Sequence, residues 1–179
     1  IQPNLSYIEY FEKKKNKLLE KTPLYAEEGE AMTRLNQTNA KYASMVFSVD
    51  KNIGKLINYL KNNNLYENSL IIFTSDNGGF AKATDNSPLR ANKGAYYEGG
   101  IRVPLIVRWP SKIKKGKLIE TPVISPDIYP TCLAAANSNL KDGQICDGIN
   151  LLPVIMENHK IDRSSIYWHF PHYNGHPSS

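Results

Sequence analysis

The sequence lacks the features that mark membrane-spanning and disulfide-rich proteins. None of its 179 residues fall in a run approaching the roughly 20 apolar residues that a membrane-spanning helix requires, so no membrane partner is expected. Its two cysteines, Cys132 and Cys146, would suffice for one disulfide but not for a disulfide framework. Because Cys132 stands among leucine and alanine residues, we expect it to be a small buried thiol. The cysteines leave the redox compartment open.

The start of the sequence also lacks an initiator methionine and a leader segment. It opens on Ile1-Gln2-Pro3 instead of a methionine, and no charged, apolar and small-residue leader follows. We therefore expect the chain to be a piece of a longer protein.

What the sequence does contain is the composition of a folded domain with an excess of lysine. Hydrophobic residues make up 41% of the chain, which excludes a disordered or low-complexity protein. Lysine plus arginine number 22 against 17 acidic residues, for a formal net charge of +5. The lysines gather at residues 13–17 and 112–117, and neither run is interleaved with aromatic residues as in single-strand-binding platforms. We expect solvated surfaces and no nucleic-acid partner; contact with a polyanion such as a sulfated polysaccharide is the alternative.

Hydrophobic spacing predicts helices that alternate with strands. Residues 1–30 are expected to form a short helix within a long connection, and residues 31–61 a long amphipathic helix facing a core. A further helix should begin at Ser125-Pro126-Asp127, with Ser125 as its N-cap. Strands are expected at three apolar runs, the first two buried on both faces: 69–74, 101–109 and 166–168. This order predicts an α/β fold with a mostly parallel sheet and flanking helices.

A candidate metal site directly follows the first of these strands, at Asp76-Asn77-Gly78-Gly79. Ligands of open α/β sheets collect beyond the carboxyl ends of strands. A neighbouring carboxylate and carboxamide supply oxygens that suit Ca²⁺ or Mg²⁺ better than zinc, and the glycines permit a close backbone approach. The alternative is an ordinary turn, since Asp-Asn-Gly favours turns in any context.

Two cations lie in the glycine-bearing loop between the first two predicted strands. Arg90 and Lys93 could be aimed at an anion in the same cleft. An ammonium group is a compact charge with rotatable donors, suited to a tetrahedral oxyanion. The alternative for Lys93 is a solvated surface lysine.

Taken in order, these segments resemble the type I sulfatases, the formylglycine-dependent branch of the alkaline-phosphatase superfamily. The resemblance runs in register from about residue 40 to the end of the chain. The matching segments are Tyr42-Ala43-Ser44-Met45 with Ser48-Val49-Asp50, Ser75-Asp76-Asn77-Gly78-Gly79, Leu89-Arg90, Lys93-Gly94, Glu98-Gly99-Gly100-Ile101-Arg102-Val103-Pro104, Trp109-Pro110, Asp127-Ile128-Tyr129-Pro130-Thr131, Asp147-Gly148-Ile149-Asn150-Leu151-Leu152-Pro153 and Tyr167-Trp168-His169-Phe170-Pro171-His172-Tyr173.

The resemblance implies a role for each matching position. Asp76 and Asn77 would be ligands of a Ca²⁺ ion, with Mg²⁺ as the less favoured metal, and Lys93 would contact the sulfate oxygens during catalysis. His169 and His172 would lie near the substrate's sugar, with a structural aromatic loop as the alternative. Structural ion pairs that hold the loop are expected from three residues: Arg90, Glu98 and Arg102.

The family's nucleophile is not in this sequence. Type I sulfatases form formylglycine within a Cys/Ser-x-Pro/Ala-x-Arg motif, which neither cysteine matches, and the early Asp-Asp pair of the metal site is also absent. We therefore expect residues 1–179 to be the second part of one catalytic domain, inactive alone. It would comprise a connecting segment (1–30), an α/β core portion (31–165) and the start of an aromatic and histidine-bearing segment (166–179).

The expected activity is hydrolysis of a sulfate ester on a small molecule or glycan, in the periplasm or outside the cell as in relatives. Two alternatives remain open. One is a phosphatase or phosphonate-ester hydrolase of the same superfamily. The other is a non-enzymatic basic module that binds carbohydrate or nucleic acid.

Overall fold

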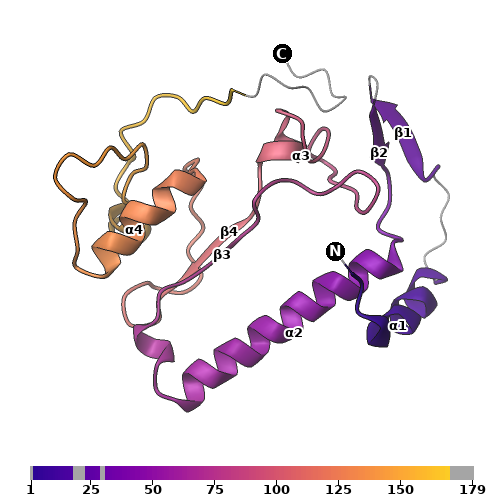
Figure 1. Cartoon of the computed structure of the whole chain (residues 1–179), viewed down its shortest axis with the longest axis horizontal. Helices are drawn as coiled ribbons and strands as arrows, with labels where there is room; N and C mark the ends of the chain where they lie inside the picture. Colours follow the sequence, from indigo (N-terminus) through magenta and orange to yellow (C-terminus); the bar gives the residue numbers. More distant parts are fainter. Residues whose placement is uncertain (1, 18–22, 29–30, 170–179) are drawn as a thin grey trace. The chain divides into compact units, whose positions relative to one another are not determined.

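The computed structural model describes residues 2–17, 23–28 and 31–169. These residues form two compact units that the chain enters more than once. Of the described residues, the first unit takes in 2–17, 23–28, 31–60, 74–105 and 168–169, and the second takes in 61–73 and 106–167. Each unit is described separately below (Figure 1).

In the first unit, aromatic side chains join the N-terminal helix to the long helix. Helix α1 (Leu5–Lys15) begins after Asn4, whose side-chain oxygen accepts a hydrogen bond from the Ser6 backbone N–H. The Tyr7 and Phe11 rings meet Phe47 of α2 (Ala40–Asn62) edge to face, at centroid separations of 4.8 and 5.7 Å. The predicted short helix in residues 1–30 is confirmed.

A β-hairpin precedes the long helix, and the sequence did not predict it. Strands β1 (Tyr25–Glu28) and β2 (Ala31–Arg34) pair antiparallel, with Tyr25 opposite Arg34. The prediction that the helix begins near residue 31 was therefore wrong. Asn39 sets the actual start, because its side chain accepts a hydrogen bond from the Tyr42 backbone N–H at 3.1 Å.

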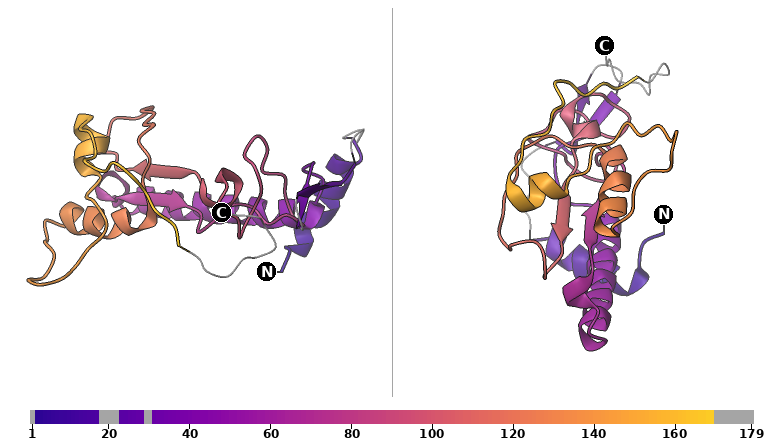
Figure 2. Two further views of the ribbon diagram at one scale, coloured as in Figure 1. Left: turned by 90° about the horizontal axis from the view of Figure 1, so that it is seen from above. Right: turned by 90° about the vertical axis from the view of Figure 1, so that its left-hand side faces the viewer.

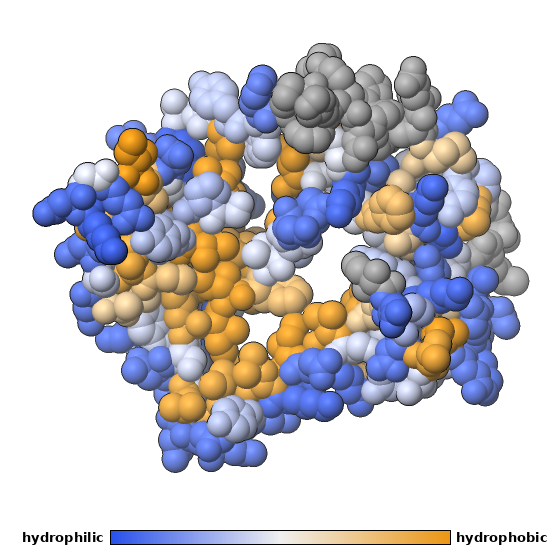
Figure 3. Space-filling view, viewed as in Figure 1, coloured by the Kyte–Doolittle hydropathy of each residue, from blue (hydrophilic) through white to orange (hydrophobic). Residues whose placement is uncertain are grey.

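The predicted apolar side of α2 is present, but it is not buried in a core. Ala40 and Ser44 are the buried residues of this helix, whereas Val46, Val49 and Leu56 are each at least half exposed. Figure 3 shows hydrophobic side chains along one side of α2 and hydrophilic ones along the other. The expectation that this side faces a core is therefore wrong for Val46, Val49 and Leu56.

Strands β3 (Ile71–Thr74) and β4 (Leu105–Arg108) are neighbours in a two-stranded sheet. The second predicted strand was placed too early, because Glu98–Ile101 forms a helical turn, α3. The two strands are also less buried than predicted: Phe73 is 40% exposed and Ile106 is 58% exposed. Their apolar residues thus form strands, but no described layer covers both faces.

In the second unit, the segment at 125–127 begins a helix in a different way from the one expected. A 3₁₀ turn, η2 (Ser125–Asp127), leads into α4 (Ile128–Ala135). The cap is made by Asp127, whose carboxylate accepts a hydrogen bond from the Ile124 N–H at 2.9 Å, so the predicted Ser125 cap was wrong. Helix α5 (Leu152–Glu157), the yellow helix in Figure 2, contacts α4.

A polar pair, Asp127 and Thr131, forms the buried side of η2 and α4. Both side chains are almost fully buried, and Thr131 Oγ1 donates to the Asp127 carbonyl while accepting from the Leu151 N–H at 2.8 Å. This turns the neighbouring Cys132 outward, so the prediction of a buried thiol was wrong. Cys132 and Cys146 are both free.

The Asp127 carboxylate also binds a side chain and a backbone N–H from later in the chain. Arg163 donates to both carboxylate oxygens, one of these bonds measuring 3.1 Å, and the Ile149 N–H donates to Oδ1 at 2.8 Å. Burial opposes ionisation of Asp127, but these hydrogen bonds, with that from Ile124 and the charge of Arg163, leave its pKa below the ordinary value. One carboxylate therefore holds three separate stretches of the unit together.

The last described residues do not form the predicted third strand. Residues 166–168 have no regular secondary structure, and Trp168 is half exposed. Among the described helices, none combines the length and apolar character needed to cross a bilayer.

Candidate functional site

The candidate metal ligands directly follow β3 in a loop that is open to solvent. Asp76 is exposed and Asn77 is half-buried, and Ser75 Oγ donates a hydrogen bond to the Asn77 carbonyl at 2.9 Å. The pKa of Asp76 lies below its ordinary value, chiefly through the hydrogen bond from the Asn77 side chain and to a lesser degree through the positive charge of Lys93. Asp76 is thus an ionised oxygen donor next to a neutral one.

Close packing of glycines fixes the backbone after these residues. The Gly78 N–H donates to the Gly100 carbonyl at 2.8 Å, and a Cβ atom at Gly78 would lie 1.7 Å from the Gly99 carbonyl oxygen. A Cβ atom at Gly99 would in turn lie 2.4 Å from the Arg90 carbonyl oxygen. Any side chain at these positions would collide with backbone, which is why glycine is needed there.

Lys93 is brought to this loop by its own backbone. Its N–H donates to the Gly79 carbonyl at 3.0 Å, and its side chain is exposed. Asn86, which the sequence did not single out, bonds Gly79 from both ends of its amide, accepting from the N–H at 3.1 Å and donating to the carbonyl at 3.0 Å. The position of Asn86 in a turn-forming Asp-Asn-Ser-Pro stretch was the available signal.

The residues expected to hold this loop lie around α3. Arg102 and Glu98 form an ion pair with an N–O distance of 3.2 Å, and both side chains are well exposed. The Arg90 guanidinium lies over the Tyr97 ring, 3.8 Å from its centroid, as in a cation–π contact. The Gly99 N–H donates to the Arg90 carbonyl at 2.7 Å, so the backbone also joins the two parts of the loop.

Of the two candidate histidines, the structure describes one. His169 is exposed, at the end of the described chain. His172 lies outside the described residues. Their role near a sugar stays a prediction.

The donor chemistry at Asp76 and Asn77 fits a hard cation, but only in part. A carboxylate and a carboxamide oxygen are ligands that Ca²⁺ prefers, yet Ca²⁺ takes about six to eight oxygen ligands. Within residues 2–17, 23–28 and 31–169, no group of three or more histidine, cysteine, aspartate or glutamate residues could hold a metal ion. These two residues would therefore be part of a shell that other donors complete.

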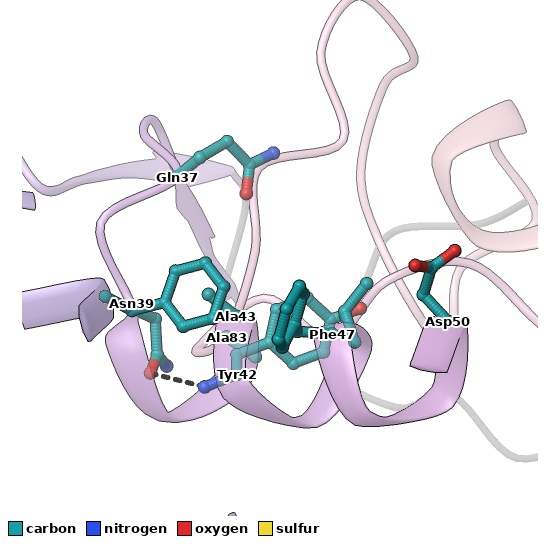
Figure 4. A pocket seen from close by; sticks show the side chains of 9 residues that line it. Gln37, Asn39, Tyr42, Ala43, Phe47, Asp50 and Ala83 are labelled. Carbon is teal, nitrogen blue, oxygen red and sulfur yellow. Dashed lines mark hydrogen bonds between the residues drawn. The ribbon is translucent and has the colours of Figure 1, made fainter. Parts of the chain in front are cut away.

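A separate cavity of about 440 Å³ lies in the first unit. Figure 4 shows aromatic rings from α2 on its wall and the Asp50 carboxylate at one end. It contains none of the candidate site residues. Its lining residues are Phe11, Gln37, Asn39, Tyr42, Ala43, Val46, Phe47, Asp50 and Ala83.

Comparison with known proteins agrees with the order of these segments. The family model described as Sulfatase matches residues 5–138, so the chain belongs to the sulfatase family. A protein named Sulfatase from Formosa agariphila is 38% identical over 149 residues, which span 76% of this chain and 27% of that protein. N-acetylgalactosamine-6-sulfatase from Rattus norvegicus is 30% identical over 151 residues, which span 82% of this chain and 28% of that enzyme.

Solved structures confirm the α/β fold class. The crystal structure of Ps i-CgsB in complex with k-i-k-neocarrahexaose is 36% identical, with a TM-score of 0.64 over 86% of this chain and 37% of that one. BT4656, solved with its substrate D-glucosamine-2-N,6-O-disulfate, is 28% identical, with a TM-score of 0.54 over 75% of this chain and 27% of that one. The chain thus spans little more than a quarter of the length of the curated relatives described here.

Proposed function

We propose that the protein containing this chain hydrolyses a sulfate ester carried by a sugar. The observation that carries the proposal is the hydrogen bond from the Lys93 N–H to the carbonyl of Gly79, the last residue of the Asp76-Asn77-Gly78-Gly79 segment, which brings Lys93 to the loop of the candidate ligands. Oxygen donors and an ammonium group in one loop system are the parts needed to bind a sulfate group and offset its developing charge. Relatives solved with a carrageenan hexasaccharide and a glucosamine disulfate favour a sulfated glycan as the substrate.

Each residue in the proposed site has a separate task. Asp76 and Asn77 would hold Ca²⁺, which supplies a positive charge that polarises the sulfate group when bound. Lys93 would bind a sulfate oxygen through its ammonium group and orient the ester. The glycine packing would keep the loop in place before substrate binds, and the exposed ion pair of Glu98 with Arg102 would add only a little to this.

Other residues of the same protein would complete the site. The formylglycine motif is absent from these 179 residues, and two ligands are too few for Ca²⁺. We infer that this chain is the second part of a sulfatase catalytic domain and is inactive without the remainder. The exposed apolar side of α2 supports this inference, because a stripe of that width normally packs against other elements.

The test of the proposal is an aryl sulfate assay on the sulfatase that contains this chain. Lys93→Ala should lower kcat/KM by about 10²–10³-fold, as expected for a group that offsets transition-state charge. Asp76→Asn should weaken Ca²⁺ binding measured by titration calorimetry, because it removes an anionic ligand. Lys82→Ala serves as the matched control, since it removes an exposed lysine of the same loop system.

Two outcomes would contradict the proposal. If Lys93→Ala and Lys82→Ala had the same activity as the wild type, Lys93 would have no role in catalysis. If aryl phosphate were hydrolysed faster than aryl sulfate, the phosphatase alternative would replace the sulfatase one.

A further inference from the structure

The two lysine runs look alike in sequence, but the structure places them in different electrostatic surroundings. In α1, the Lys13 ammonium lies 2.6 Å from the Glu9 carboxylate, and the Lys15 ammonium lies 3.9 Å from that of Glu12. These are exposed pairs one helical turn apart, which partly cancel the charge of the run. The first run is therefore a mixed-charge helix surface.

The second run keeps its charge. We name residues 111–117 the basic loop; its members Lys112, Lys114 and Lys115 are exposed and form no ion pair with any described residue. Four lysines fall within six residues, spaced by Ile113 and Gly116. Short lysine-rich segments of this kind mark sites for polyanions such as heparin or nucleic acid.

The basic loop is also fixed to the second unit. Ile113 is 7% exposed, and its N–H donates to the Trp109 carbonyl at 2.7 Å. At the start of the loop, the Ser111 N–H donates to the Glu67 carbonyl at 3.0 Å. At its end, the Lys117 ammonium donates to the Ile155 carbonyl at 2.7 Å, near the end of α5. A loop held at three points loses less conformational entropy when a ligand binds.

From this arrangement we propose that the basic loop binds a sulfated polysaccharide chain at sulfate groups other than the one being cleaved. The inference rests on the proposed function for its choice of ligand, because a sulfatase acting on a glycan polymer meets further sulfates along the same chain. Three ammonium groups on one short loop match several sulfates, and a ligand with a single sulfate would engage only one of them. The occupant is thus a polymer with repeated sulfate groups.

The surroundings of the lysines favour a glycan over a nucleic acid. Sites for single-stranded nucleic acids add exposed aromatic rings on which bases stack. The aromatic residue next to the loop, Trp109, is only 8% exposed, so its ring offers no stacking surface. The exposed feature of the loop itself is the charge of its lysines, and this suits sulfate groups distributed along a sugar chain.

The experiment compares two triple variants of the intact sulfatase that have the same net charge. Lys112→Gln/Lys114→Gln/Lys115→Gln alters the basic loop, and Lys13→Gln/Lys14→Gln/Lys15→Gln alters α1. The probe is heparin, with affinity measured by titration calorimetry over a series of salt concentrations. We expect at least a tenfold loss of affinity and a shallower salt dependence for the loop variant, and less than a twofold change for the α1 variant.

Two further measurements separate this proposal from misfolding and from the proposed function. Lys112→Arg/Lys114→Arg/Lys115→Arg should retain heparin binding, because it keeps the charges. Hydrolysis of an aryl sulfate with a single sulfate should be unchanged in the glutamine loop variant. If the enzyme were inactive on every sulfate ester but still bound heparin through the basic loop, the sulfatase proposal would be refuted and the basic-loop proposal would stand.

Three results would overturn the basic-loop proposal. One is an equal loss of heparin affinity in the α1 variant, which would show a bulk-charge effect. Another is loss of binding in the arginine variant. The third is binding of duplex DNA as tightly as heparin through the same lysines, which would identify a general polyanion surface.

Discussion

The buried carboxylate of Asp127 provides a sharp test of how this chain is held together. It accepts hydrogen bonds from the backbone N–H groups of Ile124 and Ile149 and from two nitrogens of Arg163. Asp127→Asn keeps the size of the side chain but removes its charge and replaces one acceptor oxygen with a donor. Each carboxylate oxygen accepts two of these four bonds, so two donors are then left without an acceptor.

The expected loss of stability is large. Removing one partner of a buried ion pair costs about 3–5 kcal/mol, because the other charge is left uncompensated. Each stranded buried donor costs about 1–3 kcal/mol, so hydrogen-bond accounting gives a similar size. Native proteins are stable by about 5–15 kcal/mol, and this one substitution therefore removes a substantial share.

Urea unfolding followed by circular dichroism at neutral pH measures this loss. The control is Glu98→Gln, which breaks the 3.2 Å ion pair with Arg102. The Glu98 side chain is 60% exposed and that of Arg102 is 67% exposed. Exposed pairs contribute about 0–1 kcal/mol, so this control should have little effect. If Asp127→Asn lowered the free energy of unfolding no more than Glu98→Gln, the reasoning from burial would be refuted.

The same carboxylate predicts a pH dependence of defined sign. The pKa of Asp127 is lowered in the folded protein, so the unfolded chain takes up a proton at higher pH than the folded one. Its stabilising contribution is then complete above the ordinary aspartate pKa of about 4 and is lost as the pH falls through the lower folded value. The stability difference between wild type and Asp127→Asn should stay constant above about pH 6, which is roughly two pH units above that pKa, and should shrink in acid.

Two further predictions concern backbone positions. Gly99→Ala should lower both stability and aryl sulfate turnover, because its Cβ would lie 2.1 Å from the Ala91 carbonyl oxygen. The control is Gly54→Ala, where nothing lies within 4 Å of the added Cβ. If the two variants unfolded at the same temperature, the packing argument would be contradicted. Asn39→Ala should lower the free energy of unfolding by about 1 kcal/mol in urea unfolding, because it removes the N-cap of α2. Asn39→Ser should retain most of that stability, and equal losses in the two variants would exclude capping as the cause.

Local patterns in the sequence predicted much of the fold. The end of α2 at Asn62 and the strand at Ile71–Thr74 follow from apolar spacing and from the asparagine run between them. The hairpin at Tyr25–Arg34 was missed because its short strands lack a strong apolar alternation. The turn at Glu98–Ile101 was missed because tight backbone packing, and not helix propensity, places two glycines there.

In the candidate site, too, some residues could be predicted from the sequence and others could not. Asp76, Asn77 and Lys93 could be selected from residue type and motif order, because their chemistry is visible in the sequence. Asn86 could not be selected, because its role depends on hydrogen bonds with Gly79, seven residues earlier. Nor could the sequence distinguish the paired lysines of α1 from the unpaired ones of the basic loop, since that difference lies in the positions of carboxylates.

The glycine packing restricts how this loop system can be altered by evolution or by design. Gly78 touches Gly99 and Gly100 backbone to backbone, so the segment after β3 and the segment around α3 have complementary surfaces without side chains. A loop exchanged between sulfatases at only one of these segments would meet a mismatched partner. The two segments should therefore be transplanted together, as a single cassette.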